Sequence, residues 1–94
     1  MKMNYDTLVN EQGYTYFGSL GDYSLYIKLD NIEDNYYYKA YILWHENVKS
    51  HGQEKLINNV ELDLIKIAMA EIDKTDNNDE REMHVSLIND LLGI

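Results

Sequence analysis

The chain has 94 residues and a formal net charge of −9 at pH 7, and 45% of its residues are hydrophobic. This length predicts a single domain over residues 1–94, and the content of apolar and aromatic residues excludes a disordered chain. The negative charge argues against direct binding to nucleic acid or to an anionic membrane, because both require a basic patch.

The absence of cysteine excludes a disulfide framework and a thiolate metal site. The apolar runs are too short to span a membrane, and the first residues do not resemble a signal peptide. The chain is rich in Asn, Ile, Tyr and Lys and contains no Pro, a bias typical of low-GC bacteria and their phages. We therefore expect a cytoplasmic protein of a bacterial host cell.

Residues 4–12 predict a short N-terminal helix. Asn4 is a suitable N-cap, Tyr5 and Leu8 follow at helical spacing, and Gly13 can end the turn.

From residue 14 onward the hydrophobic period changes to two, which predicts β-strands. Gly21 and Asp22 form a pair that suits a type II′ hairpin turn, and residues 31–35 form a longer polar loop. The three strands predicted from this pattern are 14–20, 23–30 and 36–44, and they form an antiparallel meander.

The alternation of apolar and polar residues in the second predicted strand indicates which face of the sheet packs against the core. This alternation places one set of apolar side chains on a single face, and we expect this face to be buried: Tyr23, Leu25, Ile27 and Leu29.

The opposite face of the meander is rich in tyrosine. We expect Tyr26, Tyr37 and Tyr41 to be exposed there, interleaved with Lys28 and Lys39. Tyrosine provides rigid contact area at protein interfaces, so these three residues are candidate partner-binding residues.

Residues 45–52 predict a loop, and a long helix follows. Asn58 and Glu61 have the spacing of a capping box, although the helix could begin as early as Gln53. The apolar residues of this helix recur every three or four positions and predict a core-facing stripe: Ile57, Leu64, Ile65, Ala68, Met69 and Ile72.

A polar turn at 75–78 precedes a second helix, with Asn77 and Glu80 as its cap and Gly93 at its end. We expect its core face to contain Met83, Leu87, Ile88, Leu91 and Leu92. The predicted fold is α+β: a three-stranded antiparallel β-meander, preceded by the short N-terminal helix, with two C-terminal α-helices packed on one face.

The polar residues do not form a recognisable catalytic or metal motif. His45, His51 and His84 lack metal-ligand spacing, and the acidic run 73–80 fails as a calcium loop because Arg81 occupies the position that requires glycine. None of the four serines lies in a nucleophile elbow, and the glycines do not form a phosphate loop. We predict a protein that is not an enzyme and has no cofactor and no metal.

Carboxylates gather around the connection between the two helices, with only Lys74 and Arg81 as nearby counterions. Such a surface can be a simple solubility device. Carboxylates one helical turn apart lie about 5 to 6 Å from each other, so they can also roughly imitate a row of phosphates. The acidic candidates for partner binding are Glu71, Asp73, Asp76, Asp79, Glu80 and Glu82.

In its size, its acidity and its lack of catalytic motifs, the chain resembles small phage or mobile-element proteins that block host defence, such as anti-CRISPR and anti-restriction DNA mimics, and also acidic immunity proteins that neutralise nucleases. This resemblance implies an inhibitor whose partner is a basic nucleic-acid-binding protein or nuclease complex. The alternative is an oligomerising structural or adaptor domain, with a tyrosine-rich interface buried in a homodimer.

Overall fold

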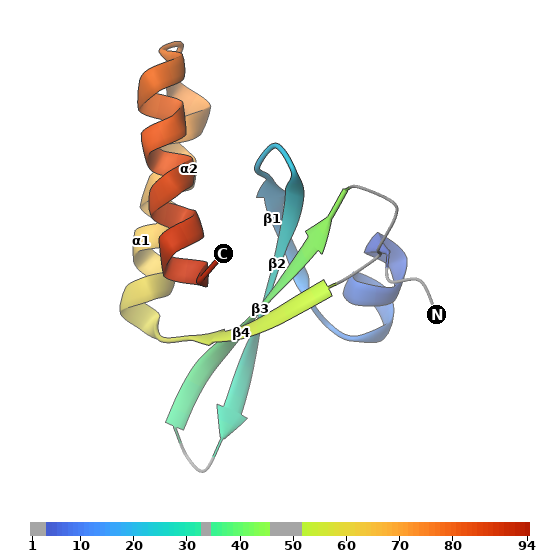
Figure 1. The fold of residues 1–94 in the computed structure, drawn as a ribbon. Helices are drawn as coiled ribbons and strands as arrows, with labels where there is room; N and C mark the ends of the chain where they lie inside the picture. Colours follow the sequence, from blue (N-terminus) through green and yellow to red (C-terminus); the bar gives the residue numbers. More distant parts are fainter. Residues whose placement is uncertain (1–3, 33–34, 46–51) are drawn as a thin grey trace. The chain divides into compact units, whose positions relative to one another are not determined.

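The structure is a computed structural model that describes residues 4–32, 35–45 and 52–94. It has the predicted α+β class, with an antiparallel sheet of four strands followed by two C-terminal helices (Figure 1). The elements are η1 (Thr7–Glu11), β1 (Thr15–Ser19), β2 (Tyr23–Ile32), β3 (Asn35–Trp44), β4 (Gly52–Ile57), α1 (Asn59–Lys74) and α2 (Asn78–Leu92).

The chain divides into two compact units. The first, Met1–Leu56, is called the sheet unit below, and the second, Ile57–Ile94, is called the helical unit. Packing of the helices on one face of the sheet stays a prediction.

The predicted N-terminal helix is present as a helical turn that continues into the π-helix η1. The side chain of Asn4 accepts a hydrogen bond from the N–H of Thr7 at 2.9 Å, which confirms the predicted capping role. The N–H of Gln12 donates to the carbonyl of Thr7 at 3.1 Å, the five-residue spacing of a π-helix. Gly13 follows with φ of +79°, a conformation that favours glycine.

The sheet has the strand order β1-β2-β3-β4. Gly21, with φ of +71°, lies in the predicted turn between β1 and β2, and the N–H of Leu20 donates to the carbonyl of Tyr23 at 2.8 Å. β2 and β3 pair from Tyr23 opposite Trp44 to Ile32 opposite Asn35. Both strands therefore extend beyond their predicted ends into the polar loop.

The prediction of three strands was wrong, because β4 forms a fourth strand beside β3. Its residues Gln53, Glu54 and Lys55 are polar and have low strand propensity, so the sequence gives only a weak signal there. The backbone of β3 supplies the missing preference, since it offers hydrogen-bonding groups along its open side. Most of the predicted loop before β4 lies outside the described residues.

Both faces of the sheet contribute to the core. On one face Leu8, Tyr14, Tyr26 and Tyr41 form a buried cluster, with Val9 and Leu43 packed against it. Leu8 belongs to η1, so the N-terminal turn covers this face. The expected core face also contains buried side chains, but its Leu29 is exposed; the buried members are Tyr23, Leu25, Ile27, Ala40 and Ile42.

Gly52 lies directly against the ring of Tyr41. A Cβ atom at Gly52 would overlap the hydroxyl and ring atoms of the buried Tyr41 side chain. We expect Gly52→Ala to reduce the free energy of unfolding by about 1 to 3 kcal/mol, because the ring must move within a packed cluster. Denaturant unfolding measures this change. In a Tyr41→Ala background the same substitution should cost much less, and equal costs in both backgrounds would contradict the overlap.

Local signals predicted the ends of both helices correctly. Asn58 and Glu61 form the predicted capping box at the start of α1. The side chain of Asn77 accepts from the N–H groups of Asp79 and Glu80 at the start of α2, and Gly93 ends α2 with φ of +73°. The predicted capping role of the Glu80 side chain was wrong, because its carboxylate accepts from the Thr75 hydroxyl and the N–H of Asn77 donates to that same hydroxyl.

The predicted core faces of the helices were only partly correct. Ile65, Ala68, Ile88 and Leu92 are buried as expected, and Leu62 is also buried. Three residues expected in the core are instead exposed: Leu64, Met83 and Leu87.

Candidate partner-binding surface

The six carboxylates predicted to bind a partner are all exposed in the helical unit. They follow the end of α1, the connection and the start of α2, and they are Glu71, Asp73, Asp76, Asp79, Glu80 and Glu82.

Hydrogen bonds hold the connection between α1 and α2 in place. The Thr75 hydroxyl donates to the Glu80 carboxylate at 2.9 Å and accepts from the N–H of Asn77 at 3.1 Å. The Arg81 guanidinium donates to the Thr75 carbonyl at 3.0 Å. The neighbouring carboxylates are therefore presented from a short connection with defined geometry.

The charge of the helical unit is poorly balanced. It contains nine carboxylates against Lys66, Lys74 and Arg81, a formal charge of −6 out of the total of −9. Among the described residues, no ion pair joins a carboxylate of this unit to a Lys or Arg, and the observed pair of Lys39 with Asp30 lies in the sheet unit. The acidic surface thus keeps most of its charge available to a partner.

The three predicted tyrosines do not share one exposed face. Tyr26 and Tyr41 are 3% and 6% exposed, whereas Tyr37 is 38% exposed. The expectation of exposure was wrong for Tyr26 and Tyr41 because η1 folds over their side of the sheet, which the alternation of β2 and β3 cannot reveal. Their part in partner binding stays a prediction, and of the three only Tyr37 presents its side chain to solvent.

Burial also changes the acidity of the core tyrosines. Burial raises the pKa of Tyr23 to about 12. Burial, with a smaller contribution from nearby Tyr16, raises the pKa of Tyr26, and burial together with the Glu54 carboxylate raises the pKa of Tyr41. These phenols are neutral hydrogen-bonding groups at ordinary pH.

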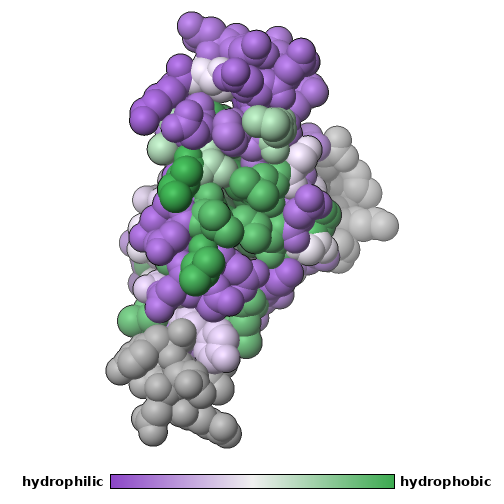
Figure 2. All heavy atoms as spheres, turned by 90° about the vertical axis from the view of Figure 1, so that its left-hand side faces the viewer, coloured by the Kyte–Doolittle hydropathy of each residue, from purple (hydrophilic) through white to green (hydrophobic). Residues whose placement is uncertain are grey.

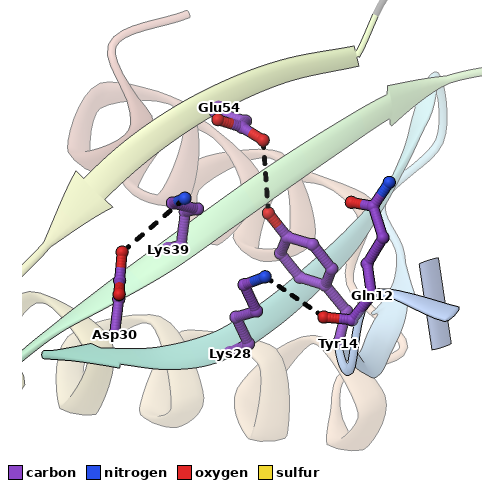
Figure 3. Close-up of polar contacts among 6 residues, drawn as sticks. All are labelled: Gln12, Tyr14, Lys28, Asp30, Lys39 and Glu54. Carbon is purple, nitrogen blue, oxygen red and sulfur yellow. Dashed lines mark hydrogen bonds and ion pairs between the residues drawn. The ribbon is translucent and has the colours of Figure 1, made fainter.

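Polar contacts surround Tyr14 at one side of the tyrosine cluster (Figure 3). Its hydroxyl donates a long hydrogen bond of 3.5 Å to Glu54 on β4. The Lys28 ammonium lies 4.8 Å from the centre of the Tyr14 ring and donates to the carbonyl of Gln12 at 3.1 Å. Burial first, and then the Glu54 carboxylate, raise the pKa of Tyr14 above its ordinary value.

The same region contains an open hollow of about 340 Å³. The Lys39 ammonium lies 3.6 Å from the Asp30 carboxylate within it (Figure 3). Two carboxylates and two ammonium groups oppose each other here, so the hollow favours neither anions nor cations; its lining residues are Asp30, Lys39, Glu54, Lys55 and Leu56.

Sequence reasoning missed a hydrogen-bonded chain that joins β1, β2 and the end of β3. The Ser24 hydroxyl lies 2.7 Å from His45 Nε2, and His45 Nδ1 lies 2.9 Å from the Gly21 carbonyl. Because a carbonyl only accepts, Nδ1 donates, and in the neutral ring Nε2 then accepts from Ser24. The hydrogen bonds continue from the Ser24 hydroxyl to the Ser19 hydroxyl at 3.0 Å, and from the Ser19 hydroxyl to the Tyr16 hydroxyl at 2.8 Å.

This chain has one feature of a nucleophile and base pair, the short contact between Ser24 and His45. However, Ser24 is buried and the third group is the Gly21 carbonyl rather than a carboxylate. We interpret these hydrogen bonds as structural contacts that connect the ends of the strands. No sequence signal links Ser24 with His45, which lie 21 positions apart.

Other expectations concern metal ions and membranes. Within residues 4–32, 35–45 and 52–94, no group of three or more His, Cys, Asp or Glu side chains could hold a metal ion. His51 lies outside these residues. In the same part of the chain, no helix has the length and apolar character needed to cross a membrane.

Comparison with protein-family models, with curated proteins and with solved structures gave no match. The function is therefore argued from the surface of the molecule itself.

Proposed function

We propose that this protein is a small non-enzymatic inhibitor that binds a basic nucleic-acid-handling protein through its acidic helical unit. The observation that carries the proposal is the set of six exposed carboxylates around the connection of α1 and α2, none of which pairs with a described Lys or Arg. Such a row can occupy a basic groove in place of a phosphate backbone. This corresponds to a phage or mobile-element anti-defence protein of the anti-CRISPR or anti-restriction type that acts as a DNA mimic.

The positions of two carboxylates support a functional reading of this surface. Glu71 and Asp73 lie in the last turn of α1, where the helix dipole disfavours negative charge. Asp79 and Glu80 lie at the start of α2, where the dipole favours it. Stability alone therefore does not account for the whole acidic surface, and local conflicts of this kind are expected at functional sites.

The first test neutralises part of the acidic surface while keeping the shape of its side chains. The variant Asp76→Asn, Asp79→Asn and Glu82→Gln leaves Glu80 bonded to Thr75. With each exposed charge contributing up to about 1 kcal/mol, we expect partner affinity to fall roughly 5- to 100-fold and its salt dependence to flatten. Pull-down from a bacterial lysate at low and high salt identifies the partner, and titration of that purified partner measures the affinity.

A matched control neutralises three exposed carboxylates of the sheet unit: Asp6→Asn, Glu11→Gln and Asp22→Asn. Both variants have the same net charge, so a general effect of charge would weaken binding equally in both. Equal loss would contradict the assignment to the helical unit. Displacement of the protein from its partner by DNA would support competition for a nucleic-acid groove, and simultaneous binding of both would contradict mimicry.

The alternative function, an oligomerising adaptor domain with a tyrosine-rich interface, has less support. Tyr26 and Tyr41 are already buried inside the sheet unit, so of the three tyrosines predicted for such an interface only Tyr37 stays exposed to a second copy. A mass in solution that rises with protein concentration would favour this alternative.

A further inference from the structure

The helical unit has an exposed apolar surface in addition to its buried one. Val60 and Ile67 on α1 are 67% and 61% exposed, and Met83 on α2 is 61% exposed; Leu64 and Leu87 are exposed as well. Hydrophobic atoms gather into a patch over the helices, with hydrophilic atoms around it (Figure 2). The name outer patch is used below for these five residues.

The spacing of the outer patch forms one stripe on each helix. Val60, Leu64 and Ile67 are separated by four and three positions, and Met83 and Leu87 by four, so within each helix they lie above one another. At 3.6 residues per turn, the centre of each stripe lies roughly 130 to 140° around the helix from the centre of the buried stripe, and Leu64 lies one turn from the buried Ala68. The buried residues are Leu62, Ile65 and Ala68 on α1, and Ile88 and Leu92 on α2.

Each helix thus has exposed apolar side chains beyond those that it buries, whereas a surface helix needs only a buried stripe to pack against its own protein. A contiguous exposed apolar patch bordered by polar residues is typical of an interaction site.

Within each helix, the charged residues spaced one turn from a residue of the outer patch all have the same sign. Every Asp, Glu, Lys or Arg three or four positions from a patch residue is acidic, and Lys66, Lys74 and Arg81 all lie at other spacings. Arg81 also donates to the Thr75 carbonyl. The six acidic neighbours are Glu61, Asp63, Glu71, Asp79, Glu80 and Asp90.

We propose that the outer patch binds an amphipathic helix of the partner, with apolar side chains on one face and Lys or Arg along its borders. This deepens the proposed function and rests on it, since it names the element of the basic partner that is bound. The carboxylates that border the patch would pair with those cations while the apolar stripes exclude water. A second copy of this chain would bring identical carboxylate borders together, so charge disfavours self-association.

The length of the outer patch indicates how long the bound helix needs to be. The stripe from Val60 to Ile67 extends about 10 Å along α1 at a rise of about 1.5 Å per residue. A partner segment of roughly three turns is therefore sufficient, with anchors at three- or four-residue spacing.

The probe for this surface is a synthetic helical peptide of about 15 residues with leucines at helical spacing and lysines between them. A second peptide has the same leucines but glutamates in place of the lysines. With the full-length protein, we expect measurable binding of the lysine peptide and none of the glutamate peptide. Equal binding of the two peptides would overturn the role of the acidic border.

The decisive variants remove apolar surface without changing charge. Ile67→Ser with Met83→Ser should weaken binding of the lysine peptide at least about tenfold. Leu29→Ser with Leu56→Ser is the matched control, because these side chains are exposed apolar residues of β2 and β4. We expect the control to bind as the unmodified protein does, and equal affinities for all three proteins would overturn the proposal.

Two further measurements separate this inference from the alternatives. If Ile67→Ser with Met83→Ser lowers the stability as much as a core substitution, or dissociates a homodimer, the patch is covered by this chain or by a second copy, and the inference is wrong. If that variant still captures the natural partner with unchanged affinity while the variant of Asp76, Asp79 and Glu82 does not, the inference fails and the proposed function stands.

Discussion

Raising the pH above about 10 should unfold the sheet unit, because its core contains phenols that resist ionisation. Burial raises the pKa of Tyr23 from 10.0 to about 12, and the pKa values of Tyr14, Tyr26 and Tyr41 are also raised. The folded state holds these protons more tightly than the unfolded state. The stabilisation is therefore complete below pH 10 and is lost as the pH rises through the folded pKa values.

The expected size of this effect is large for a small domain. Each buried tyrosine removes about 1.4 kcal/mol of stability per pH unit between its unfolded and folded pKa values. Tyr23 alone accounts for roughly 3 kcal/mol between pH 10 and 12. Circular dichroism and phenolate absorbance, followed together against pH, should change in a single cooperative transition.

A substitution identifies the contribution of Tyr23. Tyr23→Phe keeps the ring beside Trp44, whose centre lies 5.3 Å away, and should move the alkaline transition to higher pH. Tyr5→Phe is the matched control, since this phenol is half exposed. Complete phenolate formation in a protein that keeps its native circular dichroism would show that burial does not hold these protons.

Truncation of Leu8 should have the second large effect. Leu8 is fully buried, and its side chain belongs to the cluster of Tyr14, Tyr26 and Tyr41. Leu8→Ala should reduce the free energy of unfolding by about 3 kcal/mol, because it removes buried methyl groups and leaves a cavity among rings that cannot fully close it. Denaturant unfolding measures the loss, and near-UV circular dichroism should show weaker tyrosine packing.

Leu29→Ala provides the control for this substitution. It removes the same atoms from a side chain that is 58% exposed, so its effect should stay below about 0.5 kcal/mol. If Leu8→Ala is as mild as Leu29→Ala, the N-terminal turn does not stabilise the tyrosine face.

The Leu8→Ala variant also tests which unit of the protein binds the partner. Without the cover of η1, Tyr26 and Tyr41 would become available to a partner, as the sequence predicted. A protein that gained partner affinity on loss of Leu8 would assign binding to the sheet unit rather than to the helical unit.

The sequence by itself determined the features that depend on neighbouring residues. Asn58 with Glu61, Asn77 and Gly93 correctly located the helix ends, because caps form within one turn of the chain. Alternation predicted β1, β2 and β3. The acidic character of the helical unit was equally evident, because formal charge follows from composition and exposed carboxylates need no particular partner.

Only the tertiary structure decided the features that depend on distant residues. β4 is a strand because β3 pairs with it, although Gln53, Glu54 and Lys55 give little preference of their own. Tyr26 and Tyr41 are buried because η1 covers them, and the contact between Ser24 and His45 forms only when strand ends meet. Periodicity predicts that a helix has an apolar face, but the elements that pack against it decide which of its apolar side chains are covered. For this reason Leu64, Met83 and Leu87 were predicted in the core and are exposed on the helices.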